Sequence, residues 1–332
     1  MSKQHSAIVK GLAILLMMLY HLPRIMGKGG LEPSVASFLG SISYPIQYFL
    51  IVSGYGLYYA YKQNRLNWKY LFKRTTRLYI SFWLSIVICV FAVGTWLRPG
   101  LFNLSPYRIV TNLIGWRWDF CQFTWFLFTY VLLTFCSKGI FKIIDRLGNI
   151  ASLVLTYVIS IGMGWVISRY YDPFLRYNYP IYHIVLVLEM VSGFTAGAVM
   201  ARIVLAGKRL TWSKLQGKNA LVVLLILISF FLKGINNIIP VIPYFSAFIV
   251  WLIAHINPGV ISKRIFVPLG NMSMMMWFLH GYIGPILFKD YYLMLKSPAL
   301  IWIVWVIISY CAARLLMPVS DFIAKALGLS KR

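Results

Sequence analysis

Long runs of apolar residues, each followed by a short polar stretch, succeed one another along almost the whole chain. An α-helix needs about 20 mostly apolar residues to cross a bilayer, and it satisfies its backbone hydrogen bonds internally. The pattern therefore predicts an all-α, polytopic membrane protein with about ten transmembrane helices in one membrane-embedded domain, residues 1–332. The predicted spans cover residues 6–23, 37–61, 78–96, 121–137, 148–168, 181–201, 219–237, 239–255, 266–287 and 298–317.

The composition supports a membrane protein and argues against a soluble protein that binds nucleic acid. Only 12% of the residues are charged, about half the fraction usual in soluble domains. Lys and Arg number 32 against 7 Asp and Glu, a formal net charge of +25. In a soluble protein this excess would suggest nucleic acid, but here the cations fall between apolar runs, where anionic lipids attract them. We expect membrane lipids, and no nucleic acid, as partners.

The distribution of the cations predicts how the chain is oriented in the membrane. The two termini and the alternate loops that share their side hold 22 of the 32 Lys and Arg residues. Because cytoplasmic loops carry the excess of Lys and Arg, we expect both termini in the cytoplasm. Lys10 then lies near the inner surface and His21 in the outer half of the membrane.

The first predicted span carries a cation and an imidazole on one helix face. Lys10 and His21 are almost three whole turns apart, a rise of roughly 16 Å. An ionisable residue inside an apolar helix is costly and marks a functional site by default. The competing interpretation is a lysine anchored at the headgroups and a histidine that snorkels at the far end. We expect Ser6 to cap this helix and Pro23 to end it.

Two arginines open the third span. Arg74 and Arg77 are three positions apart on one helix face, and two guanidinium groups suit bidentate phosphate binding. A basic cluster at a cytoplasmic helix end is equally explained as membrane anchoring. Both interpretations stay open at this point.

Glu189 is the clearest acid inside a predicted span. Acids at that depth usually face the interior of the bundle and pair with another group. His183 lies six positions earlier, on a different face, so it is not the local partner. Gly193 and Gly197 on the same span favour close helix packing.

Four further residues are candidates for the substrate path. Ser273 and His280 share a helix face late in the chain, and His280 is either a second polar group in a cavity or a packing histidine. Ser53 with Gly54 interrupts an aromatic surface, which permits close helix packing or room for a substrate. Trp125 begins the fourth span as an interface aromatic or as a pore residue.

Several common sites are absent from the sequence. It has no GxxxxGK[ST], HExxH or GxSxG motif, and its four cysteines lack a CxxC or metal-ligand spacing, so we predict no metal. His21 has no acid five positions later. The HxxxxD arrangement of soluble and peripheral glycerolipid acyltransferases is therefore missing.

Five short motifs occur in a characteristic order along the chain. They are Lys10 with His21, Tyr48-Phe49 through Ser53-Gly54-Tyr55, Arg74 with Arg77, Trp125-Phe126-Leu127, and Ser273 through His280. Together they resemble the acyltransferase-3 family of bacterial integral-membrane acyltransferases. The first cation is Lys rather than the commoner Arg, and Met274 to Met276 replace frequent aromatic and polar residues. We expect no hydrolase-like extracellular domain of the kind fused to some relatives, which favours a stand-alone enzyme.

The resemblance implies an acyl-CoA-dependent O-acyltransferase in a bacterial inner or plasma membrane. Its expected activity is transfer of acetyl from acetyl-CoA to hydroxyls of a cell-surface polysaccharide or a lipid-linked sugar precursor. In this interpretation Arg74, Arg77 and Lys10 bind the CoA phosphates. His21 acts as general base or transient acyl carrier, and Glu189 orients or charge-balances its imidazole.

A transporter or flippase for a glycolipid or polysaccharide is the alternative function. It predicts polar residues spread along several spans and, often, repeated halves. Intramembrane polar residues are few here and no internal repeat is visible, which favours the enzyme.

Overall fold

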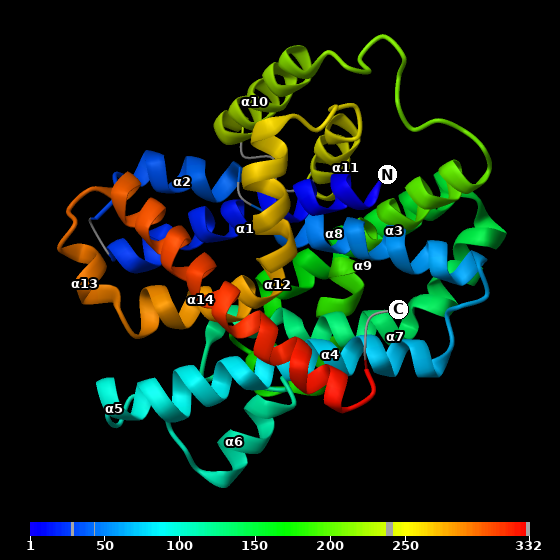
Figure 1. Cartoon of the computed structure of the whole chain (residues 1–332). Helices are drawn as coiled ribbons and strands as arrows, with labels where there is room; N and C mark the ends of the chain where they lie inside the picture. Colours follow the sequence, from blue (N-terminus) through cyan, green and yellow to red (C-terminus); the bar gives the residue numbers. More distant parts are fainter. Residues whose placement is uncertain (28–29, 43, 237–241, 330–332) are drawn as a thin grey trace.

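The computed structural model describes residues 1–27, 30–42, 44–236 and 242–329, and every regular element within these ranges is helical (Figure 1). The α-helices are α1 (Lys3–Met26), α2 (Pro33–Ile42), α3 (Ile46–Lys62), α4 (Trp68–Ile86), α5 (Thr95–Leu97), α6 (Pro106–Leu113), α7 (Phe126–Leu147), α8 (Asn149–Tyr170), α9 (Tyr179–Leu205), α10 (Asn219–Asn236), α11 (Ile242–Ile253), α12 (Val267–Gly281), α13 (Lys289–Leu293) and α14 (Pro298–Ala326). Short 3₁₀ or π-helical segments join or extend them: η1 (Val87–Gly94), η2 (Gln122–Thr124), η3 (Leu175–Tyr177), η5 (Ser262–Phe266) and η6 (Tyr282–Ile286).

Seven helical stretches in the described part of the chain are long and apolar enough to cross a membrane. They are Lys3–Met26, Pro33–Lys62, Trp68–Leu97, Gln122–Leu147, Asn149–Tyr170, Tyr179–Leu205 and Pro298–Ala326. This confirms an all-α polytopic membrane protein. The other three predicted spans also fold as helices, but α10 and α11 are shorter apolar helices and α12 is prolonged by π-helical turns at both ends. The predicted junction of the seventh and eighth spans, at 237–241, lies outside the described residues.

Helix α1 lies in the middle of the bundle and carries both residues of the first predicted site. It begins one turn earlier than expected, because Ser2, and not Ser6, accepts the capping hydrogen bond from the His5 N–H. The polar residues 3–5 are compatible with helix, so the first turn forms there. Pro23 lies inside the last turn, and the helix ends at Gly27 with φ 73°, a conformation that glycine adopts without steric cost.

Two pairs of helices approach closely through glycine. A Cβ added at Gly54 of α3 would overlap the carbonyl of Phe194, and one added at Gly197 of α9 would overlap the carbonyl of Ile51. Gly270 of α12 meets the backbone of α1 at Ala7 in the same way. The packing interpretation of Gly54 and Gly197 is confirmed, and the close approach at these glycines and at Gly270 fixes α3 against α9 and α1 against α12.

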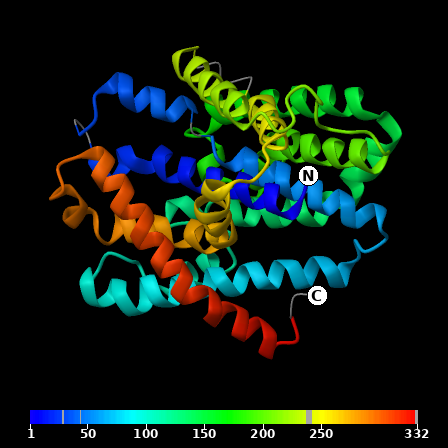
Figure 2. The same cartoon turned by 45° about the horizontal axis from the view of Figure 1, so that its top comes forward.

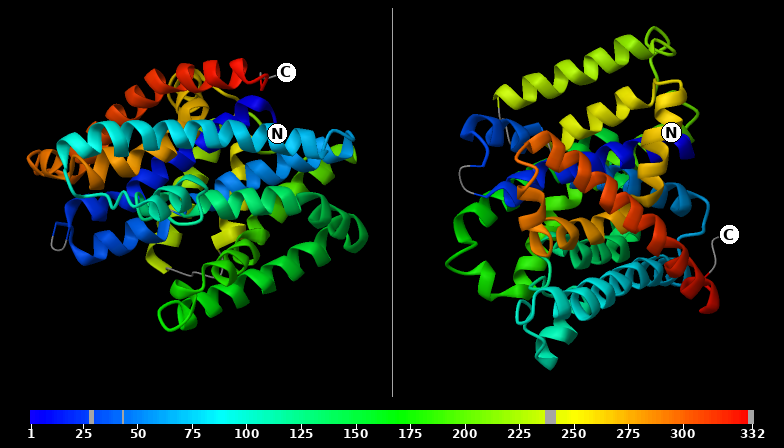
Figure 3. Two further views of the ribbon diagram at one scale, coloured as in Figure 1. Left: turned by 90° about the horizontal axis from the view of Figure 1, so that it is seen from below. Right: turned by 60° about the vertical axis from the view of Figure 1, so that its left-hand side comes forward.

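The two ends of the bundle differ in what they contain. The long helices α1, α4 and α7 run along a common axis, and both termini lie at the same end of it (Figure 1, Figure 2). Helices α5 and α13 lie at the opposite end, where the connection after α5 folds back onto the bundle through α6 (Figure 1, Figure 3). Tyr79 and Trp83 of α4 donate hydrogen bonds to the carbonyls of Ile114 and Leu113, which hold α6 in place.

Candidate active site

A cavity of about 460 Å³ lies among α1, α3, α4, α7 and α12, and we call it the cation cavity. Lys10 from α1 and Arg74 from α4 line it, and none of its described lining residues is Asp or Glu. Its other polar lining groups come from Ser6, Ser53, Tyr55, Tyr130, Asn271 and Ser273. A partly enclosed space lined by two cationic side chains attracts and concentrates anions.

Neutral hydroxyl groups hold the Arg74 side chain in this cavity. One terminal nitrogen, Nη2, donates to Ser53 Oγ at 2.9 Å and to Tyr130 Oη at 2.7 Å, and these two oxygens are 2.6 Å apart. The buried Nε has no hydrogen-bond partner among the described residues. Because buried donors are normally paired, the geometry fixes the guanidinium in position and leaves one N–H for an acceptor that a ligand would supply.

Arg77 lies outside the cation cavity. It pairs with Asp321 of α14 through an Nη2–Oδ1 distance of 2.7 Å, and its Nη1 donates to the carbonyl of Leu329 at 3.1 Å. The arginine therefore joins α4 to the end of the chain. The structure brings Arg74 and Lys10 together and directs Arg77 toward a different neighbour.

His21 lines a smaller pocket of about 100 Å³, the His21 pocket, with Trp125 also in its wall. Met17, Phe126 and Trp277 line both this pocket and the cation cavity. These three apolar side chains are thus a shared wall, with Lys10 and Arg74 on one side and His21 on the other. Rearrangement of this wall would connect the two spaces.

A second imidazole lies against His21. The ring centroids of His21 and His280 are 5.5 Å apart with an interplanar angle of 24°, and Phe123 packs edge-on against His21 at 4.3 Å. His280 Nδ1 donates to the carbonyl of Trp277 at 2.6 Å, and its buried Nε2 has no partner among the described residues. A protonated Nδ1 makes this neutral ring an acceptor at Nε2.

Ser273 and His280 of α12 follow the same direction as Lys10 and His21 of α1. Ser273 lines the cation cavity and donates to the carbonyl of Gly270 at 2.8 Å, whereas His280 lies beside His21. Trp277, between them in sequence, lines both spaces. The two helices therefore run parallel, each from the cation cavity to the imidazole pair.

Glu189 lies close to the His21 pocket without contacting the histidine. No hydrogen bond or ion pair joins Glu189 to His21 in the described part of the chain. The acid instead interacts electrostatically with Tyr44, which lines the His21 pocket, and with Tyr182 of α9.

Two residues of the site carry no signal in the sequence. Tyr130 completes the hydroxyl pair under Arg74, and Phe123 packs on His21. Both belong to a stretch in which aromatic residues are frequent, and 17% of the whole chain is aromatic. Only the packing of α7 and η2 against α1 and α4 distinguishes them from neighbouring aromatic residues.

Comparison with known proteins gives one match. A family model described as an acyltransferase domain matches residues 7–318, which is nearly the whole chain. No curated protein and no solved structure matches the chain.

Proposed function

The chain belongs to the acyltransferase-3 family, and from this premise we propose that it transfers an acetyl group from acetyl-CoA to sugar hydroxyls. The proposed acceptor is a cell-surface polysaccharide or its lipid-linked precursor in the bacterial cell envelope. The observation that carries the proposal is the wall shared by the cation cavity and the His21 pocket. A donor anchored by its phosphates in the cavity would reach the imidazole by passing this shared wall.

The donor would bind with its phosphates at Arg74 and Lys10. A fixed guanidinium that still has an unpaired N–H is suited to a phosphate oxygen. The pantetheine arm would extend past Met17, Phe126 and Trp277, because these apolar side chains border both spaces. Arg77 would stabilise the C-terminal end of α14 beside the donor and would not contact it.

The chemical step needs a base for the sugar hydroxyl and a proton donor for the leaving thiolate. His21 would take the proton of the sugar hydroxyl as its oxygen attacks the thioester carbonyl. Collapse of the tetrahedral intermediate would break the carbon–sulfur bond, and the CoA thiolate would take the proton from His21. The products are the sugar ester and free CoA, so atoms and charges balance.

His280 would set the tautomer of His21. Its Nε2 is an acceptor, because Nδ1 donates to the Trp277 carbonyl. An N–H of His21 directed at this nitrogen would leave the other His21 nitrogen unprotonated, as a general base requires. His280 is thus a positioning residue in this proposal.

The proposal is tested by mass spectrometry of surface glycans from cells with and without the gene. Loss of O-acetyl groups in the cells without it, restored by the wild-type gene and not by His21→Gln, is the expected result. Unchanged acetylation, together with a failure to move glycolipid across the membrane, would favour the transporter.

A further inference from the structure

A third cavity, of about 880 Å³, lies at the end of the bundle away from the termini. Residues from α6, the 116–122 turn, η3 and the start of α9 line it. Its aromatic and planar polar lining residues include Tyr107, Arg117, Trp118, Asp119, Gln122 and Tyr179. We call it the aromatic cleft. The proposed transfer from acetyl-CoA leaves this cleft without a role.

Aromatic rings form one wall of the cleft. The Trp118 ring centroid is 5.4 Å from that of Tyr179 and 5.8 Å from that of Tyr182, and the Arg117 guanidinium lies over the Tyr179 ring at 4.7 Å. His183 is buried behind this wall and donates from Nε2 to the carbonyl of Trp116 at 3.0 Å. The rings are therefore held in place before any ligand arrives.

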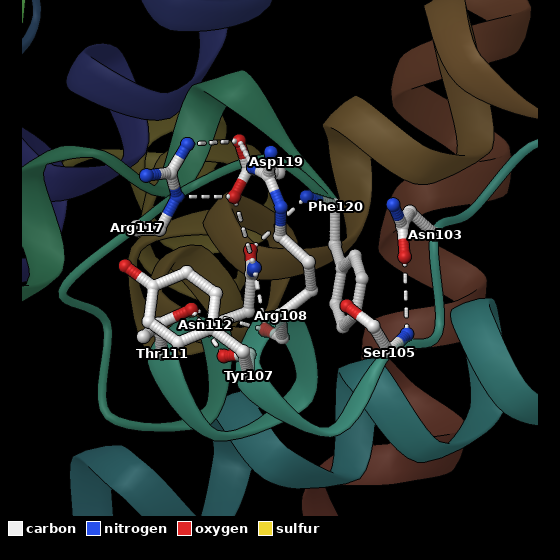
Figure 4. Close-up of polar contacts among 9 residues, drawn as sticks. All are labelled: Asn103, Ser105, Tyr107, Arg108, Thr111, Asn112, Arg117, Asp119 and Phe120. Atoms are coloured by element: carbon white, nitrogen blue, oxygen red, sulfur yellow. Dashed lines mark hydrogen bonds and ion pairs between the residues drawn. The ribbon is translucent and has the colours of Figure 1, made fainter.

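Planar polar groups of the cleft lie next to these rings. The Asp119 carboxylate pairs with two arginines: its Oδ1 lies 2.5 Å from Arg108 Nη1, and it accepts from Arg117 Nε at 2.7 Å and from Arg117 Nη2 at 3.2 Å (Figure 4). The side-chain amide nitrogen of Asn112 also donates to Oδ2 at 3.4 Å. Partial burial alone would raise the pKa of Asp119, but its hydrogen bonds to Arg117 and Arg108 and their charges lower it to about 2. The carboxylate is thus ionised at any ordinary pH, and it fixes both guanidinium groups.

We propose that the aromatic cleft binds the saccharide that carries the acceptor hydroxyl, an inference that rests on the proposed function and names the site of its second substrate. The apolar C–H face of a pyranose packs on aromatic rings, and its neighbouring hydroxyls pair with planar amide, carboxylate and guanidinium groups. Both kinds of group are present here, fixed and partly exposed. A phosphate ligand would instead need cations without a counter-charge. Here the carboxylate of Asp119 offsets one of the two positive charges of Arg108 and Arg117.

The cleft shares a short segment of chain with the His21 pocket. Gln122 lines the cleft, and the next residue, Phe123, packs on His21. Arg24, one turn after His21 on α1, is 3.5 Å from Gln122 Oε1. A saccharide bound at Trp118 and Tyr179 would therefore have the η2 segment between its ring and the imidazole.

Glu189 interacts with one tyrosine of each of the two spaces. It interacts electrostatically with Tyr182, which lines the aromatic cleft, and with Tyr44, which lines the His21 pocket. This arrangement gives Glu189 a place on the acceptor side of the imidazole. The acid would position the tyrosines that border the passage of a hydroxyl group.

The experiment uses the purified full chain in nanodiscs and glycan from cells that lack the gene. Two probes are used, the lipid-free glycan and the lipid-linked saccharide fraction, because both carry the same sugar chemistry. Binding is measured by isothermal titration calorimetry, which needs no tryptophan as a reporter, and transfer from acetyl-CoA is measured separately. Trp118→Ala with Tyr179→Ala should raise the dissociation constant of at least one probe by about tenfold or more. Trp96→Ala, at an exposed tryptophan of α5 outside the cleft, is the matched control.

The two readouts separate the possible outcomes. Trp118→Phe should recover part of the affinity, and retained acetyl-CoA binding shows that the variants fold. Equal binding of both probes by wild type and the double variant, or no binding of either probe, overturns the cleft proposal. Cleft-dependent binding without any transfer supports the cleft and rejects the proposed function.

Discussion

The cation cavity and the aromatic cleft both contain arginine, but the partners of the guanidinium groups are neutral in one and negatively charged in the other. In the cation cavity Arg74 is held by the neutral hydroxyls of Ser53 and Tyr130. In the cleft Arg108 and Arg117 are held by the carboxylate of Asp119. In the first arrangement the positive charge of Arg74 stays available to an anionic ligand. In the second, ion pairs with Asp119 offset part of the positive charge and fix the guanidinium groups as a wall of the cleft. The difference supports a phosphate-bearing donor at one end and a saccharide at the other.

The largest effect should come from His21, which lies between the two regions. His21→Ala or His21→Gln should lower the rate of acyl transfer by about 10² to 10⁴ while both substrates still bind. Gln keeps the polarity and loses the basic nitrogen, so it separates shape from chemistry. His280→Ala should be milder, since it removes only the group that orients the base. Transfer rates are compared in purified protein at saturating substrates, and near-normal transfer by His21→Gln would contradict the role of His21.

The next largest effect concerns the arginines of α4. Arg74→Ala should weaken acetyl-CoA binding on the order of a hundredfold, because it removes a fixed, partly desolvated charge from the donor site. Arg77→Ala is the matched comparison three positions away. Because Arg77 pairs with Asp321, its loss should lower the thermal stability and leave the donor affinity within a few fold. Isothermal titration with acetyl-CoA separates the two, and equal losses of affinity would place both arginines on the donor.

A smaller effect is expected when the charge balance of the cleft is changed. Asp119→Asn leaves Arg108 and Arg117 without a counter-charge and should cost about 1 kcal/mol of stability. Saccharide affinity should fall, since the guanidinium groups are no longer fixed, and acetyl-CoA affinity should not change. The measurement is a pair of titrations on one preparation. A variant that loses donor affinity instead would mean that the two regions are not independent.

The smallest effect is expected from pH, on which the saccharide affinity of the cleft should not depend near neutrality. The pKa of Asp119 is about 2 in the folded protein against an ordinary value of 3.8. A depressed carboxyl pKa stabilises the fold above the ordinary value, and this contribution is lost as the pH falls from about 4 through 2. Saccharide affinity should therefore be constant between about pH 5 and 8. A titration step in that range would show that another group controls the cleft.

The sequence predicted some of these features because they depend on helix periodicity alone. Lys10 and His21 share a face of one helix, and the apolar runs locate the helices. The different neighbours of Arg74 and Arg77 could not be predicted, since a three-residue offset turns one side chain toward Tyr130 and the other toward α14. Which helices flank α4 is a property of tertiary packing.

The aromatic cleft could not be predicted for a related reason. Trp118 and Tyr179 come from segments about 60 residues apart, and neither segment has a periodic pattern that would identify its partner. The connection around 97–120 is visibly rich in aromatic residues, but so is much of the chain. Only the folding of α6 and the 116–122 turn against the start of α9 turns these side chains into one surface.

The central claim is tested most directly by measuring whether acetyl-CoA and the glycan must be on opposite sides of the membrane for transfer to occur. Purified protein is reconstituted into sealed vesicles, with acetyl-CoA, which does not cross the bilayer, enclosed or added outside, and unacetylated glycan always outside. Randomly oriented protein is sufficient, because in each arrangement only one orientation can bind the donor. We predict transfer when acetyl-CoA is enclosed and none when both substrates are outside an empty vesicle. Equal transfer in the two arrangements would contradict a donor site in the cation cavity and an acceptor site in the aromatic cleft that open to opposite sides of the membrane.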